Sequence, residues 1–262
     1  MKFAEKLKKM VISRAVRNVK RGSAEEDSSR GMYRPEIRLD LQRSRFFTES
    51  FKETEGQPMV LRRAKALANL LEKMDIFIRD HERIVGYQTS DINGIFYPID
   101  QNWKSPKRLV GSEAGSSLLD EAGKKEFDQL CAYWKGKSFS DLYQAAIPES
   151  MQKYWGYEGT FLYTHLSDLG LPDYEHLLKT GLKGRIQEAK NKMAEIDVTI
   201  PIDYLEQKDF LQAVIISLQA VITFAQRYSA LAETMACKEK DPKRKAELEE
   251  ISHTCAWISG NP

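Results

Sequence analysis

Aromatic and polar side chains gather in residues 148–172, a stretch that has little periodic hydrophobic patterning. Connections of this length usually carry function. Aromatic walls with a few polar anchors suit a pocket that binds a small organic molecule. The side chains concerned are Tyr154, Trp155, Tyr157, Phe161, Tyr163 and His165, with Gly156, Gly159 and Gly170 between them. This stretch is therefore the first candidate for a binding region.

The cysteines and histidines do not build a conventional active site. Three cysteines, Cys131, Cys237 and Cys255, lack paired or zinc-ligand spacing, and the four histidines are isolated. The sequence also lacks a phosphate-binding loop and a nucleophile elbow. We expect each cysteine to be a packed or exposed thiol on a helix. The odd cysteine count favours a reducing, cytoplasmic environment.

Composition places the chain among ordinary globular proteins. It has 262 residues, of which 42% are hydrophobic and 30% charged, enough for one large domain or two small ones. The net charge of +2 gives no reason to expect nucleic acid as a partner. The most apolar segment, residues 210–225, is interrupted by polar residues and is short for a membrane span of about 20 residues. A buried helix is expected there.

The first 21 residues predict a basic amphipathic helix, because lysines and arginines far outnumber Glu5 and apolar residues are available for a stripe. Lysines interrupt the apolar run that a signal peptide needs. Such a helix can bind a membrane surface or a partner, but a surface helix packed on the domain or on an oligomer partner is the simpler interpretation. With a polar linker at residues 23–34, the expected organisation is helix and linker over 1–34 and one domain over 35–262.

The stretch from Glu36 to Tyr87 predicts two helices followed by a strand. The first helix is expected over Glu36–Phe51, and the second begins at Pro58, which suits a first helical turn. The apolar face of the second helix repeats at steps of four and three residues: Val60, Ala64, Leu67, Leu71 and Met74. Branched residues among charges then predict an extended segment that ends in a short buried strand over Ile84–Tyr87.

The rest of the chain predicts more helices and one further strand. A turn at Asn93-Gly94 precedes a short strand over Ile95–Ile99. One apolar face runs on from Tyr174 through Gly181, which predicts one long helix despite the glycine. Helices are expected over residues 120–133, from 139, over 173–196, from 203 or 207 to 230, and over 241–258. In the first of these Phe127 and Leu130 are expected to face inward, and the last is expected to begin at an Asp241 cap with Pro242 in its first turn. The predicted fold class is therefore mainly α with a few short strands.

Two blocks of sequence carry a family resemblance. The first contains ETEGQPMVLRRAKAL followed by IFIRDHERIVGYQ, and the second contains KDFLQAVIISLQAVITFAQRYSALAETMA followed by DPKRKAELEEISHTCAWISGNP. In this order and at this separation they resemble the N-terminal region of the glycyl radical enzymes related to pyruvate formate-lyase. The resemblance runs from about Glu36 to Pro262. It implies the N-terminal helical part of a ten-stranded α/β barrel.

The resemblance implies a cysteine that becomes a thiyl radical, in a Gly-Cys-x-Glu context, and a glycine that stores the radical. Neither motif is present in this chain, so the chain alone is expected to be inactive. Arg83-Ile84-Val85-Gly86-Tyr87 is similar to the family's radical motif, but the radical glycine lies near the C-terminal end of these enzymes. A turn that requires glycine is the simpler interpretation of Gly86.

The resemblance also implies half of a substrate pocket. In the family, the loop before a Pro-Asp-Tyr helix start contributes pocket residues, often with a Gly-His pair; this chain has Pro172-Asp173-Tyr174 but Asp168 and Leu169 in place of the pair. The substrate-binding candidates are Tyr163, His165 and Asp168. The alternative is that they cap backbone groups of the loop.

The function implied for the intact enzyme is radical cleavage or formation of a carbon–carbon or carbon–heteroatom bond in a small organic substrate, under anaerobic conditions. A separate S-adenosylmethionine-dependent activase with an iron–sulfur cluster would install the radical, so no bound cofactor is expected. The intact enzyme is expected to be a cytoplasmic homodimer. The alternative is a non-catalytic helical module that uses the same scaffold to bind a partner.

Overall fold

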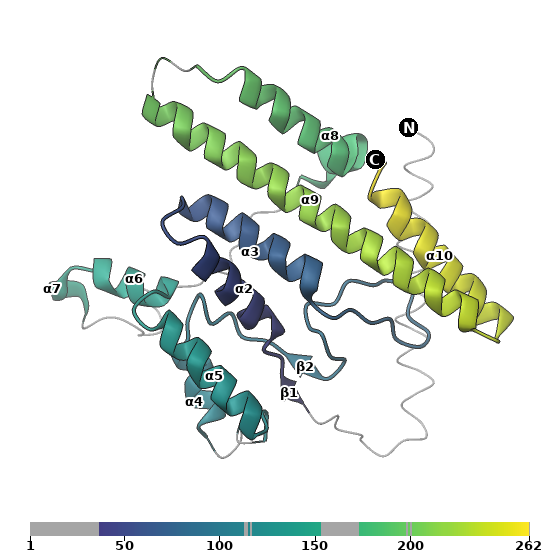
Figure 1. The fold of residues 1–262 in the computed structure, drawn as a ribbon, viewed down its shortest axis with the longest axis horizontal. Helices are drawn as coiled ribbons and strands as arrows, with labels where there is room; N and C mark the ends of the chain where they lie inside the picture. Colours follow the sequence, from purple (N-terminus) through teal and green to yellow (C-terminus); the bar gives the residue numbers. More distant parts are fainter. Residues whose placement is uncertain are drawn as a thin grey trace. The chain divides into compact units, whose positions relative to one another are not determined.

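Helices make up most of the computed structural model, which describes residues 37–112, 115, 117–152, 173–197, 199 and 201–261. Within these ranges the strands are β1 (Arg38–Leu39) and β2 (Gly94–Ile95). The helices are α2 (Gln42–Glu53), α3 (Met59–Lys73), α4 (Lys104–Val110), α5 (Glu121–Trp134), α6 (Phe139–Ala146), α7 (Glu149–Gln152), α8 (Tyr174–Ala194), α9 (Pro201–Lys238) and α10 (Pro242–Ile258) (Figure 1). The mainly helical prediction is confirmed. The expected helix and linker over residues 1–34 lie outside the described residues.

The first predicted helix begins later than expected, because its first residues form β1. Leu39 is buried, and the Asp40 carboxylate accepts a hydrogen bond from the Gln42 amide at 2.8 Å, so α2 starts only at Gln42. β1 runs parallel to β2 with Leu39 opposite Ile95. The prediction of helix from Glu36 was therefore wrong at its start, since the local carboxylate turns the chain from strand to helix.

The strand predicted over Ile84–Tyr87 is absent from the described structure, and β2 covers only the start of the one predicted over Ile95–Ile99. Ile84 is 68% exposed and Gly86 has φ of +120°. The backbone of residues 79–87 bonds to side chains of the distant helices α9 and α10 instead of to a neighbouring strand. Arg244 of α10 donates to the carbonyls of Arg79 and Glu82, at 2.7 and 2.9 Å.

Helix α3 is sandwiched between α2 and α9, and this changes which of its residues are buried. Of the predicted face, Ala64 and Met74 are buried, whereas Val60 is exposed. Ala66 and Leu70, outside that face, are buried as well. A single-face prediction fails here because two neighbours cover two sides of the helix.

Two clusters of buried side chains form the core. The first joins β1, α2, α3 and α5, and Trp134 at its centre donates to the Thr48 hydroxyl at 2.9 Å. The second joins α9 to α10 and to the segment before Arg79. Its buried members are Ile78, Tyr228, Ala232, Ala236, Leu248, Ile251 and Cys255. The predicted burial of Phe127 and Leu130 and the predicted start of α10 at an Asp241 cap are confirmed.

Helix α9 is 38 residues long and contacts α3, α8 and α10 along its length (Figure 1). Its most apolar 18-residue window has a mean hydropathy of 1.4, so by length and composition it could also cross a membrane. Only 22% of that window is buried, and Phe210 is 58% exposed. The expectation that residues 210–230 are buried on more than one side in an intact enzyme stays a prediction.

Helix α8 is not the single straight helix that its apolar stripe predicted. Gly181 has φ of +66° and ψ of +176°, which interrupts the helix between Thr180 and Leu182. Ile186 and Ala189 are buried, but Tyr174 and Leu178, in the half before the glycine, are 62% and 61% exposed. Because of the kink, the apolar residues of the first half of α8 do not share the buried face of the second half.

Arg227 of α9 contacts the C-terminal end of α3. Its guanidinium donates to the carbonyls of Leu71 and Met74, at 2.7 and 2.6 Å, at the C-terminal end of α3 where acceptors lack helical partners. Arg227→Met should lower the free energy of unfolding by about 2–3 kcal/mol, because two carbonyls lose a charged donor. Urea unfolding followed by circular dichroism measures this loss.

The matched control is Gln226→Met, an exposed position on the same turn of α9. It should change the free energy of unfolding by less than about 0.5 kcal/mol. Equal losses in the two variants would show that the Arg227 contacts do not stabilise the helix pair.

Candidate functional site

The three substrate-binding candidates, Tyr163, His165 and Asp168, lie outside the described residues, as does the whole of residues 153–172. Their proposed role stays a prediction. The structure does describe the elements on either side of that stretch. α7 precedes it, and α8 follows it, with the Asp173 carboxylate accepting from the His176 amide at 3.1 Å as the helix cap. The geometry of these flanks is what the described chain contributes to the candidate site.

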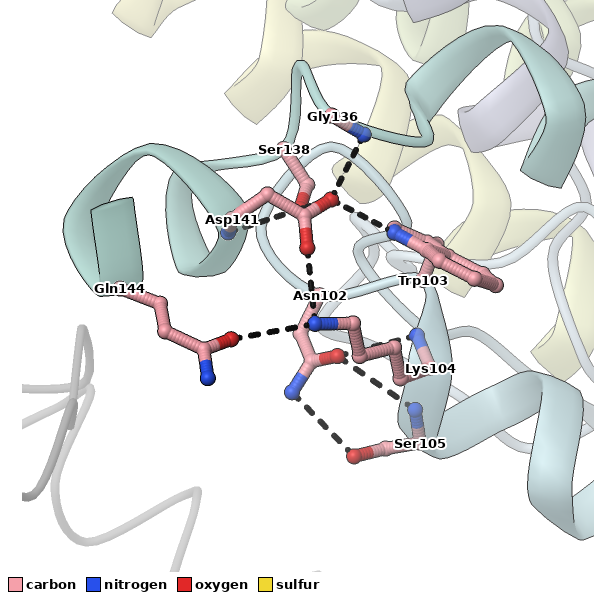
Figure 2. Close-up of polar contacts among 8 residues, drawn as sticks. All are labelled: Asn102, Trp103, Lys104, Ser105, Gly136, Ser138, Asp141 and Gln144. Carbon is pink, nitrogen blue, oxygen red and sulfur yellow. Dashed lines mark hydrogen bonds and ion pairs between the residues drawn. The ribbon is translucent and has the colours of Figure 1, made fainter. Parts of the chain in front are cut away.

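Before the stretch, one partly buried carboxylate gathers donors from two segments, the start of α4 and the residues just before α6 (Figure 2). Asp141 of α6 accepts from the Trp103 indole at 2.7 Å, the Gly136 amide at 2.9 Å and the Ser138 hydroxyl at 2.9 Å, all on Oδ2. Its Oδ1 pairs with the Lys104 ammonium at 2.9 Å. We call these five residues the Asp141 cluster. It ties the beginning of α6 to the beginning of α4.

The contacts of the Asp141 cluster favour the ionised form of the Asp141 carboxyl group. Burial of the carboxyl group opposes ionisation, but the hydrogen bonds from Lys104, Trp103, Gly136 and Ser138 outweigh it and lower the pKa of Asp141 to about 2. A carboxylate that stays ionised has no proton to give, and both of its oxygens already accept from groups of this chain. Asp141 is therefore an anchor that positions α6 and α7, and not an acid or base.

Sequence reasoning missed this cluster, although a signal was present. Ser138-x-x-Asp141 fits the pattern of a helix start in which a serine caps and an acidic residue follows three positions later. The Ser138 hydroxyl does accept from the Asp141 amide at 3.2 Å. The contacts from Trp103 and Lys104 come from 37 or more positions away and have no local signature.

A second carboxylate, that of Asp100, helps to hold the start of α6. Asp100 is 5% exposed and pairs with Arg43 of α2 at 2.7 Å, while Arg63 of α3 lies 4.0 Å from its other oxygen. The Asp100 carbonyl accepts from the Phe139 amide at 3.0 Å, where α6 begins. Arg43, and more weakly Arg63, thus hold the residue whose carbonyl accepts from the first amide of α6.

The glycine of the radical-like motif has a backbone conformation that favours glycine. Gly86 has φ of +120°, a conformation that L side chains rarely adopt, and a Cβ there would meet no atom within 4 Å. The following amide, of Tyr87, donates to the Tyr228 hydroxyl at 3.3 Å. The segment borders a shallow hollow of about 490 Å³ that is lined by residues 86–89 and 94–96. Its walls bring no cluster of titratable groups together.

The cysteines are placed as thiols without an activating partner in the described structure. Burial raises the pKa of Cys131 to about 11, and burial also raises the pKa of Cys255. Cys237 is exposed near the end of α9. Among the described residues, no group of three or more His, Cys, Asp or Glu side chains could hold a metal ion.

The pKa of Asp141 predicts a pH-dependent contribution to stability. Since the folded pKa is lowered from an unfolded value of about 3.9, the contribution is complete above pH 4 and is lost as the pH falls toward 2. Asp141→Asn should cost about 2 kcal/mol at pH 7, because an amide has one acceptor oxygen for four donors. The difference from wild type, measured by urea unfolding at pH 7, 5, 4 and 3, should narrow below pH 4.

Asp128→Asn is the control, because Asp128 makes a surface pair with Lys107 at 3.3 Å and its side chain is 67% exposed. It should change stability by less than about 1 kcal/mol. A loss in Asp141→Asn that is the same at every pH would contradict the lowered pKa.

Thiol labelling tests the placement of the cysteines. At pH 8 the native chain should react with a disulfide reagent at Cys237 quickly and at Cys131 and Cys255 only after denaturation, because the thiolate is the reactive form. Cys237→Ser should remove the fast phase. A fast phase that survives in this variant would place a second thiol at the surface.

Comparisons with known proteins cover most of the chain. A family model described as pyruvate formate lyase-like matches residues 12–262. An isethionate sulfite-lyase of Nitratidesulfovibrio vulgaris is 35% identical over 245 residues, which are 86% of this chain and 29% of the relative. The chain thus spans less than a third of the length of this relative.

Solved structures agree with the sequence comparisons. The B12-independent glycerol dehydratase from Clostridium butyricum superposes with a TM-score of 0.76 at 34% identity, covering 86% of this chain and 30% of that structure. A glycyl radical enzyme from Archaeoglobus fulgidus superposes with a TM-score of 0.73 at 31% identity, again over 86% of this chain and 30% of the other. The described fold is therefore similar to one part of these larger enzymes.

Proposed function

Because the chain belongs to the pyruvate formate lyase-like family, we propose that it is the N-terminal part of a glycyl radical enzyme that eliminates a leaving group from a small hydroxylated substrate. The observation that carries this proposal is the similarity, at 35% and 34% identity, to a sulfite-lyase and to a glycerol dehydratase. Isethionate and glycerol both carry a hydroxyl on the carbon next to the bond that is broken.

The shared chemistry is loss of a heteroatom group after removal of a hydrogen atom. A thiyl radical that takes hydrogen from the hydroxyl-bearing carbon leaves a carbon radical, and the neighbouring carbon–sulfur or carbon–oxygen bond then breaks. Formate acetyl transfer, decarboxylation and addition of an arene to fumarate are less favoured, because the named relatives at this identity are a lyase and a dehydratase.

The role proposed for this chain is to form one side of the substrate pocket. Tyr163 would supply an aromatic wall, and His165 and Asp168 would supply polar anchors, since buried hydroxyl groups need hydrogen-bond partners. An aspartate accepts from a substrate hydroxyl, or it holds an arginine that binds an anionic group. The Asp141 cluster and the Asp173 cap support this role by fixing the elements at both ends of the stretch.

The cofactor and partners follow from the same proposal. The glycyl radical would be installed by a separate activase that uses S-adenosylmethionine and an iron–sulfur cluster, and the intact enzyme would be a cytoplasmic homodimer. Cys131, Cys237 and Cys255 would not act as the thiyl cysteine, because none lies in a Gly-Cys-x-Glu context. The chain by itself should therefore give no radical signal after treatment with activase.

A chimera tests the proposed reaction. Residues 37–262 replace the matched segment of the N. vulgaris isethionate sulfite-lyase, and the purified protein is activated anaerobically with that enzyme's activase. We expect a glycyl radical by EPR and release of sulfite from isethionate or of an aldehyde from glycerol or 1,2-propanediol. A normal radical yield with no product from any of the three substrates would contradict the proposed reaction class.

Asp168→Asn in this chimera tests the pocket. It should lower kcat or raise KM by about tenfold or more, the effect of losing roughly 1.4 kcal/mol from one charge-assisted hydrogen bond, while radical yield stays unchanged. Asp128→Asn, exposed on α5, is the matched control and should leave both unchanged. Unaltered kinetics in Asp168→Asn would remove this residue from the site.

The genomic sequence after the codon for Pro262 distinguishes the enzyme from the non-catalytic alternative. A continuing frame with a Gly-Cys-x-Glu motif and a C-terminal glycine motif supports the enzyme. A stop codon directly after Pro262 would favour a scaffold that binds a partner.

A further inference from the structure

Helix α8 contains a contact that a straight helix could not make. The His176 ring nitrogen Nε2 lies 2.9 Å from Glu188 Oε1, although the two residues are twelve positions apart. At 1.5 Å per residue, twelve positions of continuous helix separate two residues by about 18 Å along the axis. The contact therefore exists only because the chain bends between them.

The bend is located at Gly181, whose φ of +66° and ψ of +176° fall in a region that is essentially restricted to glycine. The Thr180 hydroxyl donates to the His176 carbonyl at 2.9 Å just before the bend. A Cβ on Gly184 would lie 3.0 Å from the Thr180 Cβ, so the first turn after the bend packs closely on the end of the first half. Glycine at both positions permits this geometry.

The polar contact across the bend is shared by three charged or titratable groups. Arg185, which lies after the bend in α8, also donates to the Glu188 carboxylate and so helps to hold it next to His176. The hydrogen bond from His176, followed by burial, which opposes it, and by Arg185, lowers the pKa of Glu188. In the described structure, the ring of His176 makes no ion pair or hydrogen bond with α9 or α10, and the carboxylate of Asp173, the cap of the same helix, bonds only the His176 amide.

The apolar stripe of the sequence and the exposure of two of its side chains favour a straight alternative. The apolar stripe runs without interruption from Tyr174 and Leu178 to Ile186 and Ala189, as it would on one continuous helix. In the kinked form the first two are 62% and 61% exposed. Straightening would return them to the line of the buried pair, whereas the kinked form keeps the His176–Glu188 contact. The side chains of His176 and Glu188 are about two-fifths exposed, so neither form is strongly favoured.

We propose that α8 is a two-state element, kinked or straight, and that His176, Glu188 and Arg185 form the latch that holds the kinked state. The state of the latch sets the direction in which the chain enters the helix at Asp173. This proposal is independent of the reaction proposed above, because it concerns the geometry of the 262-residue chain alone.

Distance measurements between spin labels test the latch. Labels on Glu175→Cys and Lys192→Cys, in a Cys237→Ser background, lie seventeen positions apart on either side of the bend, which is about 25 Å for a straight helix. With the latch intact we expect a shorter distance to dominate. Glu188→Lys should shift the distribution toward the long distance, and His176→Glu combined with Glu188→Lys should restore the short one.

Gly181→Ala should give the long distance whatever the state of the latch, because alanine does not adopt the backbone angles of the bend. Glu195→Lys, an exposed residue at the end of α8, makes the same charge change outside the latch and should leave the short distance in place. Circular dichroism checks that each variant is folded, and Glu188→Gln replaces Glu188→Lys if the latter is not. The proposal is overturned if the latch variants keep the wild-type distribution, or if Gly181→Ala keeps the short distance.

Discussion

The described structure depends on the packing of α9 against three other helices. One side of this long helix carries small residues, Ala213, Ala220, Ala225, Ala232 and Ala236, that are all buried. Small side chains let neighbouring helices approach closely, so α3 and α10 lie against α9 (Figure 1). Arg227 then adds a polar constraint, because its guanidinium occupies the carbonyl end of α3. Apolar contact brings the helices together, and the arginine fixes where α3 ends along α9.

Buried charges do similar work in the other half of the described chain. Asp141 and Asp100 each hold segments that are far apart in sequence. Asp141 accepts from lysine, indole, hydroxyl and amide donors, and Asp100 pairs with Arg43 through one oxygen. A buried charge that lacks partners is costly, so such a cluster permits one arrangement of its segments and penalises the others. The segments that lead to residue 153 are thereby placed by electrostatics more than by apolar burial. This is consistent with the short length of α6 and α7, which bury little surface.

Local patterns predicted most helices, while contacts across long sequence distances decided what local patterns could not. The Asp241 cap, Pro242 in a first turn and the inward Phe127 and Leu130 were all readable, because they depend on residues within a few positions. The strand over Ile84–Tyr87 was predicted wrongly because branched residues suit both strands and extended loops. The Tyr87 amide instead bonds to Tyr228, and Arg244 binds the Glu82 carbonyl just before the segment, which no pattern within that segment reveals. The pocket candidates rested on family resemblance, and the Asp141 cluster had only its Ser138 signal.

The arginine contact to the segment around Arg79 bears on how the protein is made. Arg244, which donates to the Arg79 carbonyl, is 165 positions further along the chain. At about 5–20 residues per second, a ribosome needs roughly 10–30 s to add that length. During synthesis, α2 and α3 can already pair before α10 has been made. The carbonyls of Arg79 and Glu82 therefore gain their contact with Arg244 only after α10 has left the ribosome. Until then, these two carbonyls of the nascent chain depend on water for their hydrogen bonds.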